Sequence, residues 1–148
     1  MELKSLYREI VNEHNLHPEH KHSLEGANMS LRGVNPSCGD DITLELKVGD
    51  DGIIEDASFT GSGCAISQAS ADMMVSLMIG RHRKDAVRIA GNFMNMIHGE
   101  DLTEEELDEL DEAASLSDIA HMPARAKCAV LSWRTLRDML GAKQDTES

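Results

Sequence analysis

The clearest indication of the fold comes from one stretch, Ile42-Thr43-Leu44-Glu45-Leu46-Lys47-Val48, because apolar and polar residues alternate along it without a break. Successive side chains of a strand point to opposite faces, so this pattern predicts a half-buried β-strand. The turn sequence Gly49-Asp50-Asp51-Gly52 follows directly and predicts a hairpin, with residues 53–60 as the returning strand. Residues 25–34 alternate in the same way and end at Asn35-Pro36. Three neighbouring strands joined by short turns predict an antiparallel sheet.

Apolar residues at three- and four-residue spacing predict helices before and after these strands. The first predicted helix, before the strands, ends near His14. Two more are predicted directly after the strands, and the second of these ends at Gly99. The last begins at Pro123, which suits the first turn of a helix, and ends before Gly141. The residues expected to face the core are Leu3, Leu6, Tyr7, Ile10 and Val11, then Ile66, Ala69, Met73 and Leu77, then Val87, Ala90, Met94 and Ile97, and finally Ala126, Ala129 or Val130, Trp133, Leu136 and Leu140.

Residues 100–112 form an acidic segment, with nine Asp or Glu among thirteen positions. Within it, Thr103-x-x-Glu106 is a capping box, and Leu107 with Leu110 gives a thin apolar stripe. A solvated surface helix is a simpler interpretation of this segment than a dedicated docking patch.

The chain of 148 residues is about the size of one domain, and it contains no internal repeat or linker. We therefore predict a single α+β domain over residues 1–142, in which helices cover a three-stranded antiparallel sheet, followed by a frayed tail at 143–148. The N-terminus has no apolar signal core, and the most apolar stretch, residues 73–79, is too short to span a bilayer. We expect a cytoplasmic protein without a membrane partner.

The 14 Lys+Arg and 27 Asp+Glu give a formal net charge of −13. Sequence-independent binding to nucleic acid depends on cations that neutralise phosphates, so this balance argues against a nucleic-acid partner. Only four aromatic residues are present, too few for a base-stacking platform.

The three cysteines, Cys38, Cys64 and Cys128, are too few and odd in number for a disulfide framework. Cys38 lies in a Pro- and Gly-containing loop, two residues before Asp40, so that its sulfur and the Asp40 carboxylate can converge on one ion. Cys64 lies in a glycine-rich turn that enters a helix, and helix N-termini favour the thiolate.

Cys128 falls in the second turn of the last predicted helix, close to Arg125 and Lys127, two cations that would stabilise an anionic site. Any one of these cysteines alone is equally well interpreted as a small packed hydrophobe. Three thiolates and one carboxylate together form a tetrahedral set suited to zinc, and soft thiolates also suit iron–sulfur clusters.

Four histidines cluster at His14, His17, His20 and His22. They raise the hypothesis of a second metal site. The segment is polar, broken by Pro18 and interleaved with charged residues, which is more typical of a solvated loop.

Three motifs in order resemble the SufU/IscU family of iron–sulfur assembly proteins: Asn35-Pro36-x-Cys38-Gly39-Asp40, Gly61-x-Gly63-Cys64-x-Ile66-Ser67-x-Ala69-Ser70 and Pro123-x-Arg125-x-x-Cys128-Ala129-x-Leu131-x-Trp133. The resemblance runs from Tyr7 to about Leu140. It is closest to the SufU branch, because extra residues lie at about 101–119 and Lys127 stands where IscU-type scaffolds place a histidine.

The resemblance implies an IscU-like fold and a zinc ion held by Cys38, Asp40, Cys64 and Cys128. It also implies a SufS-type cysteine desulfurase as partner, with Cys38 accepting the persulfide sulfur once a partner histidine takes its place on zinc. Asp40 would then tune how readily the site opens. Arg125 would steady the site or grip the partner, and we favour this role over an ordinary helix ion pair.

We therefore expect a zinc-dependent sulfurtransferase that serves iron–sulfur cluster assembly and its downstream proteins. One alternative is a scaffold on which the same four residues, Cys38, Asp40, Cys64 and Cys128, hold an iron–sulfur cluster before its transfer. Another is a purely structural zinc domain that docks other proteins through its acidic helix.

Overall fold

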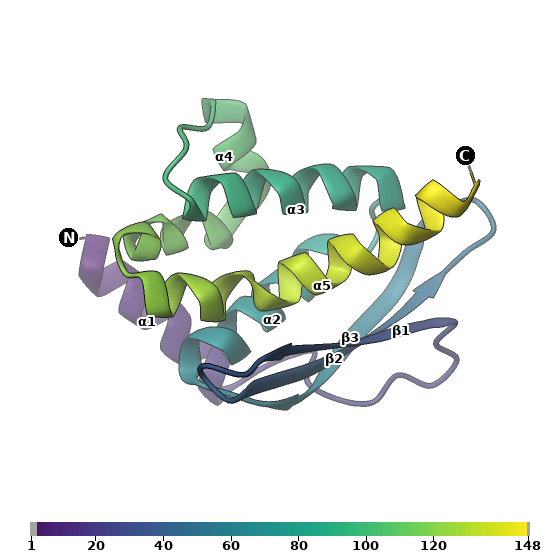
Figure 1. Ribbon diagram of the computed structural model, residues 1–148, viewed down its shortest axis with the longest axis horizontal. Coiled ribbons are helices and arrows are strands. Elements are labelled where there is room, and N and C mark those ends of the chain that lie inside the picture. Colours follow the sequence, from purple (N-terminus) through teal and green to yellow (C-terminus); the bar gives the residue numbers. More distant parts are fainter. Residues whose placement is uncertain (1–2, 148) are drawn as a thin grey trace.

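The computed structural model describes residues 3–147 of the chain, with side chains described for residues 8–141. Within these described residues, three strands and six helices follow one another (Figure 1). They are α1 (Leu3–Leu16), β1 (Met29–Asn35), β2 (Asp40–Val48), β3 (Ile54–Ser62), α2 (Ala65–Met78), α3 (Arg83–Ile97), α4 (Glu104–Leu110), the 3₁₀ helix η1 (Asp111–His121) and α5 (Pro123–Glu147).

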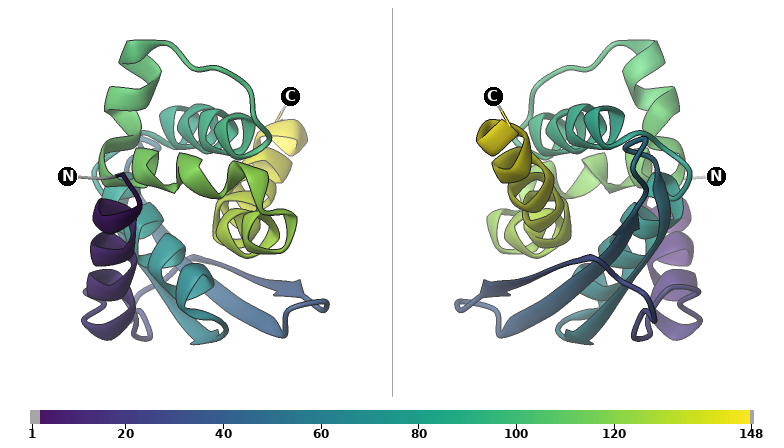
Figure 2. Two further views of the ribbon diagram at one scale, coloured as in Figure 1. Left: turned by 90° about the vertical axis from the view of Figure 1, so that its left-hand side faces the viewer. Right: turned by 90° about the vertical axis from the view of Figure 1, so that its right-hand side faces the viewer.

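The sheet is antiparallel in the order β1-β2-β3, as the alternation predicts. The inward face of β2 is formed by its apolar residues Ile42, Leu44, Leu46 and Val48, all of them buried. The end-on views show the helices gathered over one face of this sheet (Figure 2). The predicted α+β fold, with helices covering a three-stranded antiparallel sheet, is therefore confirmed.

The core joins α2, α3 and α5 around one aromatic pair. The rings of Phe93 and Trp133 stack with centroids 3.9 Å apart, and Trp133 Nε1 donates to Ser70 Oγ at 2.8 Å. Ser70 Oγ in turn donates to the backbone oxygen of Ala129 at 2.6 Å. These contacts fix the rotation of α5 and therefore the direction in which its first turns project.

The strand β1 lies directly under α5. A Cβ atom added at Gly33 would collide with the Thr135 side chain, so this close approach requires a glycine. The predicted strand at residues 25–34 is too long at its start, because pairing with β2 begins only at Met29. Leu31 of this edge strand remains 38% exposed, so the alternation there does not correspond to complete burial of one face.

The acidic segment forms the helix α4, and its predicted capping box is present: Glu106 N donates to Thr103 Oγ1 and Thr103 N donates to the Glu106 side chain. The segment that follows folds as η1, which periodicity did not predict. The predicted stop at Gly99 is confirmed, since the Gly99 and Glu100 amides bond back to the end of α3.

The prediction that the last helix ends before Gly141 is wrong, because α5 continues to Glu147. A glycine inside a helix costs only about 1 kcal/mol, so it does not by itself end one.

The predictions of which residues of the last helix face the core are confirmed for Ala129, Trp133, Leu136 and Leu140, all of which are buried. The side chains of Leu3, Leu6 and Tyr7, and those of the predicted tail from Lys143, lie outside the described residues. In the described part of the chain no helix has both the length and the apolar character needed to cross a membrane.

Candidate metal centre

The turn between β1 and β2 positions Cys38. The two strands close on the cross-strand pair Asn35 and Asp40, and the Cys38 amide donates to the Asn35 backbone oxygen at 3.2 Å. Cys38 is exposed at this turn. Its Sγ lies 3.9 Å from the backbone oxygen of Ala124, in the first turn of α5. The tight turn therefore presents Cys38 to the start of the last helix.

Cys64 begins α2 as its N-cap residue. Its sulfur accepts from the Ser67 amide at 3.4 Å, and its own amide donates to Asp40 Oδ1 at 3.0 Å. A Cβ atom at Gly63 would lie 2.6 Å from the same Asp40 oxygen, which explains the glycine that precedes the cysteine. The glycine-rich motif thus allows the backbone to approach the Asp40 carboxylate closely.

Cys128 completes the cluster from the second turn of α5, where it is buried. One ligand atom each from Cys38, Asp40 and Cys128 lies within 4.8 Å of the others. Cys64 is outside this closest group, but it lines the same cavity of about 410 Å³ with Cys38, Cys128 and Arg125. The structure therefore brings Asp40, Arg125 and the three cysteines to one place.

The Asp40 carboxylate is the strongest sign that this cluster is made to bind a ligand. Asp40 is fully buried, and its Oδ2 has no hydrogen-bond partner among the described residues. A buried carboxylate oxygen without a partner is costly unless a cation or donor satisfies it. In a tetrahedral zinc site with sulfur at about 2.3 Å, ligand atoms are about 3.8 Å apart. The residues present therefore fit a thiolate-rich divalent site.

The pKa of the Cys128 thiol is raised well above its usual range. Burial is the main cause, and the neighbouring side chains of Cys38, Asp40 and Cys64 add to it. These neighbours favour the neutral thiol as long as only protein surrounds it. A bound cation would reverse that preference, because metal ligation requires the thiolate.

The structure separates the two cations that the sequence places beside Cys128. Arg125 lines the cysteine cavity, as predicted. Lys127 lines a different cavity on the other side of α5, with Val130 and Arg134. Residues one position apart on a helix point about 100° away from each other, which explains why Lys127 does not share the side of Cys128.

Two further polar residues at this site were not predicted from the sequence. Asn35 Nδ2 and Ser67 Oγ are buried without hydrogen-bond partners among the described residues. Asn35 pairs with Asp40 across the hairpin, and Ser67 Oγ lies 3.0 Å from the Cβ position of Gly63, beside Asp40. Both residues lie within the motifs quoted above, but only their burial in the structure distinguishes them from the other polar residues of those motifs.

The histidine cluster does not gather around one point. His14 Nδ1 lies 2.6 Å from Asp72 Oδ2, and His14 Nε2 lies 3.2 Å from Glu112 Oε1. The His20 amide donates to the other oxygen of Asp72 at 2.9 Å. Within the described residues, the group of potential metal ligands that does gather is the cysteine cluster. His14 therefore ties α1 to α2 and η1 instead of lying in a solvated loop.

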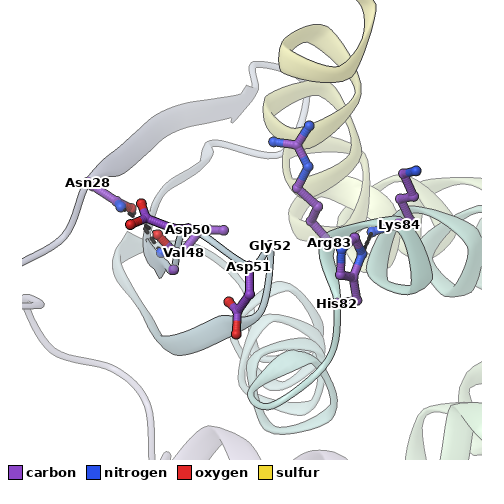
Figure 3. Close-up of a pocket in the computed structure, with 9 residues that line it drawn as sticks. Asn28, Val48, Asp50, Asp51, Gly52, His82, Arg83 and Lys84 are labelled. Carbon is purple, nitrogen blue, oxygen red and sulfur yellow. Dashed lines mark hydrogen bonds between the residues drawn. The ribbon is translucent and has the colours of Figure 1, made fainter. Parts of the chain in front are cut away.

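A second cavity, of about 420 Å³, lies at the opposite end of the sheet, between the β2–β3 turn and the start of α3 (Figure 3). Its polar groups are used by the fold: Asn28 bonds Val48 through both ends of its carboxamide, and His82 Nδ1 accepts from the Lys84 amide as an N-cap. The acidic Asp50 and Asp51 and the basic Arg83 and Lys84 also line this cavity. Among the described residues at this end of the molecule, no buried carboxylate is left unpartnered as Asp40 is at the cysteine end.

A buried aspartate and three cysteines meet where a β-hairpin approaches two helix starts, which makes this a small α+β protein with a candidate metal site. The family described as the NifU-like N-terminal domain matches residues 6–142. The iron–sulfur cluster assembly scaffold protein IscU of Thermotoga maritima is 38% identical over 140 residues, which cover 95% of this chain and 96% of that protein. The zinc-dependent sulfurtransferase SufU of Bacillus subtilis is 37% identical over 134 residues, which cover 90% and 88%.

A solved structure described as a putative iron–sulfur cluster assembly scaffold protein for the SUF system, from Fervidobacterium islandicum, superposes with a TM-score of 0.84 at 33% identity. The match covers 92% of this chain and 97% of that one. The chain therefore belongs to the NifU-like N-terminal domain family, as a protein of the IscU/SufU type.

Proposed function

We propose that this protein is a zinc-dependent sulfur acceptor, which takes sulfane sulfur from a SufS-type cysteine desulfurase for iron–sulfur cluster assembly. The observation that carries the proposal is the fully buried Asp40, whose Oδ2 has no hydrogen-bond partner among the described residues and whose carboxylate has an oxygen within 4.8 Å of the sulfurs of Cys38 and Cys128. Similarity to the protein named zinc-dependent sulfurtransferase SufU supports it.

Four residues would hold the zinc ion: Cys38, Asp40, Cys64 and Cys128. When bound, zinc would keep the cysteine sulfurs as thiolates at neutral pH. The four residues differ in exposure, since Asp40 and Cys128 are buried whereas Cys38 and Cys64 are exposed. The exposed Cys38 lies on a turn, whereas the exposed Cys64 is held as the N-cap of α2 by bonds to Ser67 and Asp40, so Cys38 is the ligand that can turn toward a partner at the lowest structural cost.

The transfer step is a thiol–disulfide type of exchange on Cys38. Its thiolate attacks the terminal sulfur of the desulfurase persulfide, and a new S–S bond forms on Cys38 as the S–S bond of the donor breaks. The donor cysteine leaves as a thiolate, so no external oxidant or reductant is needed. Arg125, which lines the same cavity, would stabilise the anionic sulfurs during this exchange.

The test combines metal analysis of the purified protein with the rate of a SufS-type desulfurase, measured with and without this protein. We expect one zinc per chain, and a stimulation that disappears in Cys38→Ala. Ser37→Ala is the matched control on the same turn, since Ser37 bonds only Asn35 and supplies no ligand. Zinc without stimulation, or equal stimulation by Cys38→Ala, would contradict the proposal.

A second candidate function is a scaffold that holds an iron–sulfur cluster. The thiolate-rich cluster itself favours it, since the same sulfurs suit iron, and two relatives at 37% and 38% identity are named scaffold proteins. Anaerobic reconstitution with iron and sulfide separates the two functions. A chromophore that moves to an apo-acceptor would favour the scaffold, whereas its absence alongside retained zinc would favour the sulfur acceptor.

A further inference from the structure

The cations of this acidic chain are unevenly distributed. Residues 119–137 contain four Lys or Arg and no Asp or Glu, although the whole chain has 27 acids and 14 Lys+Arg. Most of this stretch is the first half of α5. Elsewhere Arg32, Lys47 and Arg88 pair with carboxylates. The protein thus concentrates positive charge on the helix that carries Cys128.

Two of these cations, Lys127 and Arg134, lie on the rim of one groove. Both are exposed, and neither forms an ion pair with a residue that the structure describes. The groove, of about 400 Å³, lies where α3 and η1 end against the first turns of α5. We call it the α5 groove, and it is lined by Ile97, His98, Ala120, Pro123, Ala126, Lys127, Val130 and Arg134. Its floor is apolar, its rim is cationic, and no acidic residue lines it.

The α5 groove and the cysteine cavity are two sides of the same helix turns. Ala124, Arg125 and Cys128 line the cysteine cavity, whereas Pro123, Ala126 and Lys127 line the groove. A protein that reaches Cys38, whose sulfur is 3.9 Å from the Ala124 backbone oxygen, must therefore lie against the same end of α5. The groove and the cysteine cavity therefore adjoin along α5, because their lining residues alternate between positions 123 and 128.

We propose that the α5 groove is a docking surface for an acidic segment of the sulfur donor. This inference rests on the proposed function, because it takes the desulfurase as the partner. The fitting segment presents an apolar side chain to Val130 and two carboxylates to Lys127 and Arg134. Those two cations are seven positions apart, which is about 10 Å along a helix, so the carboxylates are spaced by about two helical turns. Complementary charges of this kind guide association and fix orientation.

The test measures desulfurase binding at several salt concentrations for the zinc-loaded wild type, Lys127→Glu and Arg134→Glu. We expect each reversal to weaken binding about tenfold at low salt, mostly through slower association, and to reduce the salt dependence. Zinc content stays at the wild-type level. Lys84→Glu is the matched control, since it makes the same change in charge at an exposed residue at the other end of α3.

The outcomes separate this inference from the proposed function. A wild type that binds no desulfurase would contradict both. If the wild type binds and Arg134→Glu binds as tightly, the groove is not part of the interface and the inference alone fails. An equal loss in Lys84→Glu would also overturn it, because the effect would then reflect net charge and not this surface.

Discussion

Asp40 and Asp72 are both fully buried aspartates, yet their surroundings are opposite. Asp72 uses both oxygens, one against His14 Nδ1 at 2.6 Å and the other accepting the His20 amide at 2.9 Å. Asp40 uses only Oδ1, which accepts the Cys64 amide at 3.0 Å, and its Oδ2 has no partner among the described residues.

The contrast between Asp40 and Asp72 shows that burial alone does not identify a functional acid. A satisfied buried carboxylate stabilises the fold, and an unsatisfied one beside two thiols costs stability until a ligand arrives. Asp72 should therefore matter for folding and not for metal binding. Asp40 should show the reverse.

The largest effect is expected from Asp72→Ala. It leaves the His20 amide and the half-buried His14 without their partner, and removing one member of a buried charged pair costs about 3 kcal/mol or more. Urea denaturation should show this loss in the free energy of unfolding. Zinc stoichiometry at low temperature should remain that of the wild type. A loss of zinc from the folded variant would contradict the assignment of Asp72 to folding and not to metal binding.

Asp40→Asn should have effects of opposite sign with and without metal. The amide keeps an oxygen for the Cys64 amide and removes the buried charge, so the metal-free protein should unfold no more easily than the wild type. Zinc affinity should fall at least about tenfold, equivalent to about 1.4 kcal/mol. Competition with a chromophoric chelator measures the affinity. Unchanged affinity would show that Asp40 is not a ligand.

A smaller, pH-dependent effect is expected at His14. Burial acts to lower the pKa of His14, but the hydrogen bonds and charges of Asp72 and Glu112 outweigh it and raise the pKa. A raised folded-state pKa gives stability that is fully present below the unfolded value of about 6.5 and lost as pH rises through the folded value. The unfolding free energy of wild type minus His14→Gln should therefore shrink as pH rises. A difference that grows with pH would contradict this sign.

The strands and the three cysteine motifs could be predicted because their signals are local. Alternation fixes the inward face of β2, and Thr103 with Glu106 fixes the start of α4 within four residues. Cys38 and Asp40 are two positions apart, so their convergence follows from the turn itself. These features depend on neighbours in sequence.

The contacts that join distant segments could not be predicted in this way. His14 and Asp72 are 58 positions apart, and nothing near either residue indicates the other. The helix α2 buries Ser67, Gln68, Ser70 and Asp72 along with its apolar face, because α1 and α5 pack on both of its sides. A polar residue in an amphipathic pattern is normally assigned to solvent, so its burial appears only when the packing is known.

The most direct test of the account is to locate the transferred sulfur. Zinc-loaded protein is incubated with a SufS-type desulfurase and cysteine, and the persulfide is mapped by mass spectrometry of non-reduced peptides. If Cys38 is the sulfur acceptor, the wild type gains one sulfur on Cys38 and Cys38→Ala gains none. An added sulfur on Cys64 or Cys128, or a wild type that gains none while the desulfurase turns over, would contradict it.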